Sequence, residues 1–285
     1  MKHVFILSVL MSSVLLLTKG CKSDGTSAAS DATLPTVTVE RNVGTDSTLQ
    51  CKFAVDYPTG DDSLSLAVCD FVRGELANNY LPVLYDLDSK DKYPLYDGAA
   101  DKSEAVVDYY ADGTLSYLKQ TVKEMLDAGM DRQPAVSYEL SIAKIADTQR
   151  YVNYEVKSYS YLGGAHGSAT DYVVNIAKPS GKVLTQTVDT LQLKALQPIL
   201  RKGVTAYLNK GGMEKVSEKD LNDHLFVDNG VIPMPAHAPY LAADGVHFIY
   251  QQYEIGPYAI GMVSFTVPYA EIKQYLTKEA LQLVE

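Results

Sequence analysis

The chain has 285 residues, of which 46% are hydrophobic and 21% are charged, as in an ordinary globular protein. Its 25 basic and 35 acidic residues give a formal net charge of −10, which argues against nucleic acid as a partner because phosphate binding needs a basic face. The same charge disfavours adhesion to anionic lipid and favours a cationic partner. The chain has 21 tyrosines but only 6 phenylalanines and no tryptophan, a bias that suits either half-buried strand positions or a tyrosine-rich contact surface.

The N-terminus is typical of an exported protein. A short charged start, Met1-Lys2-His3, precedes an apolar run that ends at Leu17 and is too short to span a bilayer comfortably. The run leads to Gly20-Cys21, which resembles a bacterial lipoprotein signal, in which cleavage before the cysteine leaves a lipidated N-terminal residue. Ordinary secretion with Cys21 in a disulfide is the alternative. We expect residues 1–20 to be a lipoprotein signal peptide, residues 21–34 a flexible tether, and Cys21 the lipid anchor.

Two further cysteines, Cys51 and Cys69, lie in the part of the chain that is expected to fold. Cys51 shares the apolar face of a predicted strand, and Cys69 falls in a helical pattern. Because exported proteins meet an oxidising environment, we expect a disulfide between them. Two buried thiols are the alternative.

Alternation of apolar and polar residues predicts most of the strands. Two early strands form a hairpin, and three later ones form an antiparallel meander whose last two strands are joined by the glycine-rich loop 163–167. The expected strands are 36–41, 48–57, 136–142, 151–161, 172–177, 246–255 and 262–267.

Helical spacing of apolar residues predicts the remaining elements. A helix through Leu66–Leu76 can be capped by Asp62 or Ser63, and a long helix begins near Asp101 and ends at Gly129. Residues 81–100 are expected to be irregular. Further helices are expected at 193–207, after Ser217 and after Pro268. Helices interspersed with hairpins predict an α+β fold, with antiparallel sheets and helices packed on them.

Three segments together resemble a known family. They are Tyr161-Leu-Gly-Gly-Ala-His-Gly167, Gly181-Lys-Val-Leu184, and Gln252-Tyr-Glu-Ile-Gly-Pro-Tyr-Ala-Ile-Gly261 followed by Phe265-Thr-Val-Pro-Tyr269. In this order and spacing they resemble the extracytoplasmic region of the RsiV-like and PdaC-like bacterial envelope proteins.

The resemblance implies a two-module fold in a cell-envelope setting. A PdaC-like α+β module would occupy residues 35–177 and an RsiV-like α+β module residues 178–285. In that group such modules occur in an anti-sigma factor that senses lysozyme, beside a polysaccharide-deacetylase domain, and in lipoproteins. The metal-ligand motifs of the deacetylase domain are not visible in this sequence, so the resemblance implies no activity.

His166 and Glu254 are the best candidates for a polar site, with Tyr161 and Tyr258 beside them in the same motifs. A histidine beside a carboxylate can perform acid–base chemistry or hold a metal. A zinc site needs three or four ligands, however, and no His-Glu-x-x-His or paired Cys-x-x-Cys motif occurs, so we expect no metal and no cofactor. The structural alternative is that His166 binds a loop carbonyl and Glu254 satisfies backbone donors in a tight turn.

We also expect the loop 163–167 and the turn 254–261 to lie close together. Both are glycine-rich connections, although a two-residue turn would be enough to join strands. Their shared excess of glycine suggests close backbone packing, in which His166 would meet Glu254 or Tyr258.

The first functional expectation is a non-enzymatic, membrane-anchored envelope lipoprotein that faces the periplasm or the cell surface. It would bind a cationic protein related to lysozyme or a cell-wall glycan related to peptidoglycan. The alternatives are an envelope hydrolase that uses His166 and Glu254, and a structural assembly subunit.

Overall fold

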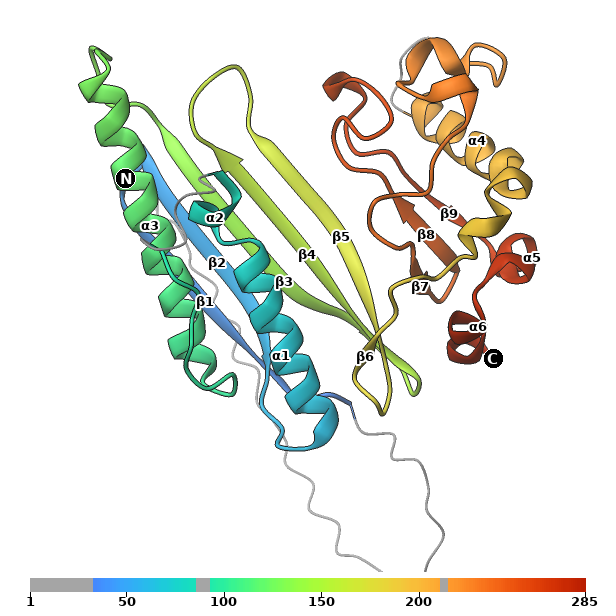
Figure 1. Cartoon of the computed structure of the whole chain (residues 1–285), viewed down its shortest axis with the longest axis horizontal. Coiled ribbons are helices and arrows are strands. Elements are labelled where there is room, and N and C mark those ends of the chain that lie inside the picture. Colours follow the sequence, from blue (N-terminus) through green and yellow to red (C-terminus); the bar gives the residue numbers. More distant parts are fainter. Residues whose placement is uncertain (1–32, 86–92, 211–214) are drawn as a thin grey trace, which may run out of the picture. The chain divides into compact units, whose positions relative to one another are not determined.

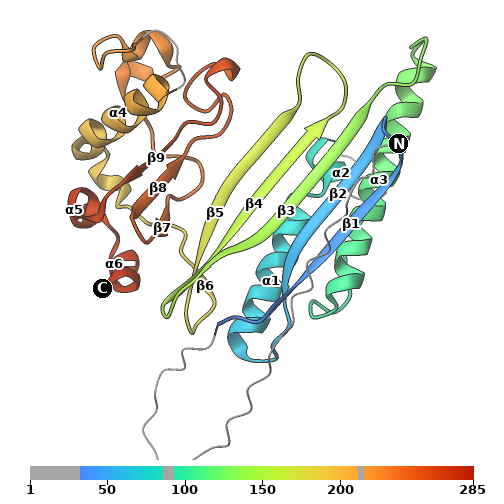
Figure 2. The same cartoon turned by 180° about the vertical axis from the view of Figure 1, so that it is seen from behind.

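The computed structural model describes residues 33–85, 93–210 and 215–285 (Figures 1 and 2). These residues belong to one compact unit, Ala32–Glu285. The expected signal peptide, the expected lipidation site Cys21 and most of the expected tether 21–34 lie outside the described residues.

A six-stranded sheet is built from the first part of the described chain. Its strands lie side by side in sequence order, and every neighbouring pair is antiparallel except β2 and β3, which are parallel. The strands are β1 (Thr36–Asp46), β2 (Leu49–Pro58), β3 (Val136–Asp147), β4 (Tyr151–Tyr161), β5 (Ser168–Ala177) and β6 (Lys182–Val183).

The parallel pair β2–β3 is joined by a helical crossover, because parallel neighbours cannot be connected by a tight turn. The crossover contains α1 (Ser63–Asn78), α2 (Leu81–Tyr85) and α3 (Ser103–Asp127). α1 and α3 pack on one face of the sheet (Figures 1 and 2). Along β2 the alternate residues Cys51, Phe53, Val55 and Tyr57 are buried toward these helices. The side chains between them therefore point to the opposite, helix-free face of the sheet.

Local contacts explain where the helices of the crossover begin and how they pack. The carboxylate of Asp62 accepts hydrogen bonds from the backbone N–H groups of Leu64 and Ser65, which makes it the expected N-cap of α1. Gly113 lies inside α3, and a Cβ atom there would stand 1.9 Å from the Tyr80 hydroxyl oxygen. A glycine is therefore required where Tyr80 crosses the helix.

Six tyrosines form an unbroken series of ring contacts on α3 and the segment before it. Neighbouring ring centroids are 5.1 to 6.4 Å apart and the rings meet edge to face, which is a favourable geometry. The order is Tyr117, Tyr93, Tyr80, Tyr110, Tyr109 and Tyr96. These six tyrosines therefore pack against one another on and before a helix, while eight others occupy strand positions, as the strand-filling interpretation expects.

A second sheet and a second hydrophobic cluster follow. The sheet is antiparallel, and α4 (Leu193–Lys210) packs on β9. Its strands are β7 (Tyr240–Ala242), β8 (Gly245–Ile249) and β9 (Ser264–Val267). The short C-terminal helices are α5 (Tyr269–Ile272) and α6 (Lys278–Val284). The single-turn 3₁₀ helices are η2 (Thr190–Gln192), η3 (Leu221–His224), η4 (Asp228–Gly230), η5 (Tyr258–Ile260) and η6 (Lys273–Tyr275).

The expected α+β class is confirmed, as are the early hairpin and the antiparallel meander of β3, β4 and β5. The strand expected at 246–255 ends at Ile249, and the stretch expected to be irregular contains α2. The division at residue 177 into two modules stays a prediction. Within the described residues, no helix combines the length and the apolar character needed to traverse a membrane.

The expected disulfide is wrong, because Cys51 and Cys69 are separate, buried thiols. The Cys51 sulfur lies 3.8 Å from the Ala111 carbonyl oxygen, and the Cys69 sulfur lies 3.7 Å from that of Pro58. Seven residues of extended strand separate Cys51 from Pro58, or about 23 Å. A disulfide needs Cα atoms within about 7 Å, so the two cysteines face different parts of one core.

Candidate functional site

The glycine-rich connection between β4 and β5 presents His166. Gly163 and Gly164 adopt φ angles of +91° and +96°, a region that favours glycine. The Tyr161 hydroxyl donates a hydrogen bond to the Gly164 carbonyl oxygen at 3.0 Å. Tyr161 therefore closes the loop from within.

His166 has a partner on each ring nitrogen and on one ring face. Its Nδ1 atom lies 3.0 Å from the Gly167 carbonyl oxygen, which can only accept, so Nδ1 carries a proton. In the neutral ring Nε2 then accepts from the Tyr253 hydroxyl at 3.2 Å. The imidazole also stacks on Tyr258, with ring centroids 3.9 Å apart. The expected proximity of the loop and the turn is therefore present, and it is made through Tyr258.

Glu254 shapes the turn that carries these tyrosines. Its two carboxylate oxygens accept the backbone N–H groups of Ala236 and Gln251, each at 2.6 Å. Burial raises the pKa of Glu254, and the two backbone hydrogen bonds oppose that rise. Among the described residues no hydrogen bond joins Glu254 to His166. Backbone groups bind Glu254, and a backbone carbonyl and two tyrosines contact His166. These contacts agree with the structural alternative, in which both residues stabilise their loops.

Gln251 and Gln252 attach the same turn to the outer edge of β5. The backbone N–H of Ala169 donates to Gln252 at 3.1 Å, and that of Asp171 donates to Gln251 at 3.0 Å. The Gln251 amide in turn donates to the Asp171 carbonyl oxygen at 2.8 Å. The side-chain amide of Gln251 thus forms the two hydrogen bonds with Asp171 that a neighbouring strand would form, and so protects the edge of the sheet. Our interpretation of the sequence missed Gln251, although it directly precedes the motif that carries the family resemblance.

Buried asparagines make a second attachment near the other end of β5. Asn153 donates to the Leu241 carbonyl oxygen at 2.6 Å, and Asn175 accepts from the Leu241 N–H at 2.8 Å. Both asparagines are about 1% exposed. Buried amides of this kind are costly unless they are paired, so these bonds fix the β5 edge against β7.

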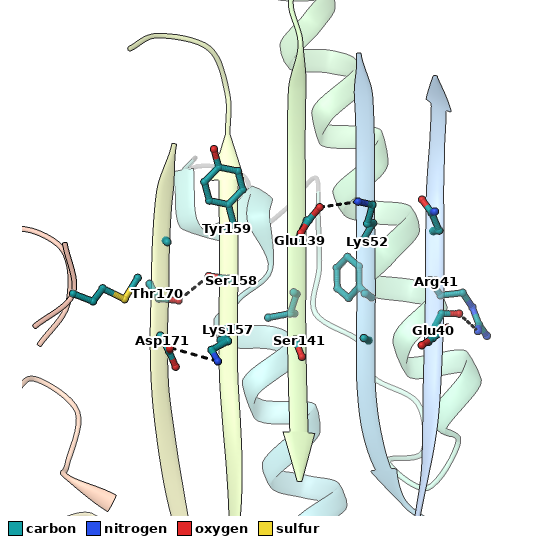
Figure 3. Close-up of a pocket in the computed structure, with 16 residues that line it drawn as sticks. Glu40, Arg41, Lys52, Glu139, Ser141, Lys157, Ser158, Tyr159, Thr170 and Asp171 are labelled. Atoms are coloured by element: carbon teal, nitrogen blue, oxygen red, sulfur yellow. Dashed lines mark hydrogen bonds and ion pairs between the residues drawn. The ribbon is translucent and has the colours of Figure 1, made fainter. Parts of the chain in front are cut away.

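A groove of about 640 Å³ lies on the helix-free face of the six-stranded sheet (Figure 3). The strand register explains its shape, because aligned residues of neighbouring strands form rows across the sheet. One row consists of Asn42, Lys52, Glu139, Tyr159 and Ala169. The next row consists of Glu40, Ala54, Ser141, Lys157 and Asp171. Ala54 and Ser141 are the small residues in the centre of the second row, and their taller neighbours form the rim.

Most of the charges along the groove are paired. Lys52 pairs with Glu139 at 2.9 Å, and Lys157 lies 3.6 Å from Asp171 (Figure 3). The lining also contains Glu40 and Arg41, but the Arg41 guanidinium pairs with Glu104 and Asp108 of α3. Burial raises the pKa of Asp171, although Lys157 counters that rise. The Oδ1 atom of Asp171 is buried and has no hydrogen-bond partner among the described residues, so this oxygen is not exposed to a ligand in the groove.

Tyr159 supplies an aromatic surface at the rim of the groove. Its side chain is 40% exposed, and a Cβ atom on Gly167 would stand 2.5 Å from its ring. A smaller cavity of about 330 Å³ begins where the groove ends, at Ala169 and Thr170, and reaches His166 and Tyr253. The expected site residue His166 therefore lies at one end of a longer surface.

The groove was missed in the interpretation of the sequence. Its signal was present in the strands, where Ala54 and Ser141 occupy outward positions that otherwise hold long polar side chains. Within the described part of the chain, no group of three or more His, Cys, Asp or Glu side chains could hold a metal ion.

Comparison with known proteins finds one protein family that matches part of the chain and two solved structures with a similar fold. No curated protein sequence matches the chain. A crystal structure of a DUF3298 family member from Bacteroides fragilis is 18% identical with a TM-score of 0.64, over 88% of this chain and 96% of that one. A DUF3298 family protein from Pseudomonas aeruginosa is 17% identical with a TM-score of 0.55, over 88% and 97% of the two chains. Residues 188–270 match the family model described as "Protein of unknown function (DUF3298)", so the chain carries a DUF3298 segment within a fold shared by these proteins.

Proposed function

We propose that this protein is a lipid-anchored cell-envelope protein that binds a cell-wall glycan in the groove on its six-stranded sheet. The observation that carries the proposal is the groove itself: a hollow with two ion pairs, small residues at its centre and an exposed tyrosine at its rim. The resemblance of its motifs to the RsiV-like and PdaC-like envelope proteins, and the signal before Cys21, support the envelope setting.

The chemistry of the groove suits an uncharged, hydroxyl-rich ligand. Sugar rings offer C–H faces that stack on an aromatic ring such as Tyr159, and their hydroxyls can both donate and accept hydrogen bonds. The hydroxyls of Ser141, Ser158 and Thr170 in the lining can donate to and accept from such groups. A cationic protein is the other candidate from the sequence, but the pairing of Lys52 with Glu139 and of Lys157 with Asp171 leaves this surface little net charge to attract it.

The hydrolase alternative has less support. Both oxygens of Glu254 accept backbone N–H groups, and both nitrogens of His166 have partners. A general base must have a free lone pair within reach of the substrate proton. These contacts favour a structural role for the pair and leave binding as the function.

The test uses the full-length chain carrying Cys21→Ser, with soluble N-acetylglucosamine oligomers measured by calorimetry and insoluble peptidoglycan measured by co-sedimentation. Ser141→Leu fills the centre of the groove and should weaken binding at least about tenfold, which corresponds to about 1.4 kcal/mol. Ser116→Leu makes the same change on an exposed position of α3 and should bind normally.

Three outcomes would overturn the glycan proposal: no binding by the parent chain, equal binding by both leucine variants, or binding only to a cationic protein such as lysozyme. In the last case the affinity should fall steeply with salt, because it would rest on the net charge. Anchoring is tested separately, since Cys21→Ser should move the protein from the membrane fraction to the soluble fraction. Unchanged membrane association would remove the lipid anchor from the proposal.

A further inference from the structure

A second cleft lies on different elements from the glycan groove. It has a volume of about 600 Å³. Its lining consists of Arg150, Ala177, Lys178, Ser180, residues 182–186, and Thr277, Glu279, Gln282 and Leu283 of the C-terminal segment. We call it the linker cleft, because residues 184–186 connect β6 to the second part of the fold. Its walls are mainly polar.

The linker cleft has an excess of positive charge, although the chain has a net charge of −10. Its three cations are Arg150, Lys178 and Lys182, and Glu279 is the one acid in its lining. Lys178 pairs with Asp147, which is not part of the lining. Arg150 and Lys182 form no ion pair with any residue that the structure describes. Two cations therefore face the cleft without a carboxylate partner.

Arg150 is held in place by a backbone carbonyl group of the C-terminal segment. Its Nη1 atom donates to the Gln282 carbonyl oxygen at 2.6 Å, which fixes the guanidinium across the cleft. A guanidinium has five N–H donors in a rigid plane and can bind phosphate through two of them at once. Further polar groups are available, because the side chains of Thr185 and Gln186 have no hydrogen-bond partner within the described ranges.

We infer that the linker cleft binds a phosphate-bearing anion, with Arg150 and Lys182 as its charged contacts and Thr185 and Gln186 as further polar contacts. Two unpaired cations match the charge of a phosphate monoester, which is about −1.5 to −2 at neutral pH. The volume leaves room for an organic group beyond the phosphate. Such a ligand is either a phosphorylated solute or the headgroup of a phospholipid.

The position of the cleft in the fold is relevant to the phospholipid headgroup as a ligand. Leu34, at the start of the described chain, donates its N–H to Asp147 at 2.7 Å. Asp147 is the same carboxylate that pairs with Lys178. The first described residues of the chain therefore lie beside the residues that support the cleft.

The experiment measures binding of inorganic phosphate and of glycerol 3-phosphate to the full-length chain carrying Cys21→Ser, by calorimetry or NMR titration. Arg150→Gln should weaken binding about fivefold to tenfold, since it removes a charge-assisted, bidentate contact. Glu279→Gln removes the opposing charge and should strengthen binding. Lys194→Gln is the matched control and should have no effect, because Lys194 lies on α4 outside the cleft and has no ion-pair partner among the residues that the structure describes.

A parallel measurement distinguishes the two sources. Vesicles of phosphatidylcholine with and without phosphatidylglycerol are sedimented with the parent chain and with Arg150→Gln. Arg150-dependent binding to the phosphatidylglycerol vesicles assigns the site to a headgroup, and binding of the free anions alone assigns it to a solute. The inference is overturned if neither probe binds, or if Lys194→Gln reduces binding as much as Arg150→Gln does.

Discussion

The imidazole of His166 lies face to face with the phenol ring of Tyr258, with centroids 3.9 Å apart and an angle of 19° between the rings. The contact joins the loop after β4 to the turn before β9, which are separated by about 90 residues of sequence. The same histidine reaches Gly167 and Tyr253 through its two nitrogens. One side chain thus connects the two motifs on which the family resemblance rests.

Replacing this side chain should destabilise the fold modestly. His166→Ala removes an aromatic stack and two hydrogen bonds, so we expect a loss of about 1 kcal/mol in the free energy of unfolding, measured by denaturant titration. His224→Ala is the control, because His224 is exposed and its side chain has no partner among the described residues. Equal losses for the two variants would show that the stack contributes nothing.

The two buried cysteines should react as free thiols only after unfolding. Burial raises the pKa of Cys51 to about 12 and that of Cys69 to about 11, so almost no reactive thiolate forms at neutral pH. In the chain carrying Cys21→Ser, a thiol reagent should label neither cysteine under native conditions and both in denaturant without reductant. Absence of labelling in denaturant would instead indicate the disulfide.

Asp147 should be among the most sensitive charged residues. Its side chain is 11% exposed and contacts Lys144, the 9% exposed Lys178 and the N–H of Leu34. Asp147→Asn removes the carboxylate charge that pairs with the buried Lys178, and we expect a loss of about 3 kcal/mol at neutral pH. Asp127→Asn breaks an exposed pair with Lys123 and should cause no measurable loss. A comparable effect of the two substitutions in thermal or denaturant unfolding would contradict this account.

The same residue has a defined pH dependence. Burial acts to raise the pKa of Asp147, but hydrogen bonds from Lys178, Lys144 and Leu34 outweigh it and hold the pKa below its ordinary value. Its contribution is then fully present above about pH 4 and is lost as the pH falls through the lowered pKa. The Asp147→Asn variant should lack this part of the acid unfolding profile.

Much of the fold could be predicted because its elements are locally encoded. The alternation in β3 and the apolar spacing in α1 and α3 identify those elements directly. Alternation does not reveal which strand lies next to which, so the parallel pairing of β2 with β3 was missed. The groove was missed for the same reason, since Ala54 and Ser141 become neighbours only through that pairing.

Part of the site could be predicted because glycine residues indicate where the backbone adopts positive φ angles. The loop at His166 and the turn at Tyr258 were identified in this way, and their contact followed from the shared motifs. The strand expected to reach Ile255 stops early because the Glu254 carboxylate binds the Gln251 N–H, and Tyr253 adopts a φ of +65°. Such a side chain–backbone contact competes with a strand and leaves no periodic signal.

His237 should make the protein less stable in mildly acidic solution. Its imidazole stacks on the ring of Tyr172 with centroids 3.8 Å apart and an angle of 3° between the rings. Burial lowers the pKa of His237, so the unfolded chain takes up the proton at a higher pH than the folded chain does. The stability due to this group is complete above about pH 6.5 and is lost as the pH falls through the lowered pKa.

The substitution His237→Phe keeps a flat aromatic ring on Tyr172 but cannot be protonated. The free energy of unfolding of this variant, measured by denaturant titration between pH 7.5 and 5, should therefore decline less than that of the parent chain. His224→Phe removes an exposed histidine without a partner and should retain the parent slope. If His237→Phe also keeps the parent slope, protonation of His237 is not what destabilises the fold in acid, and the stack on Tyr172 tolerates the charged ring.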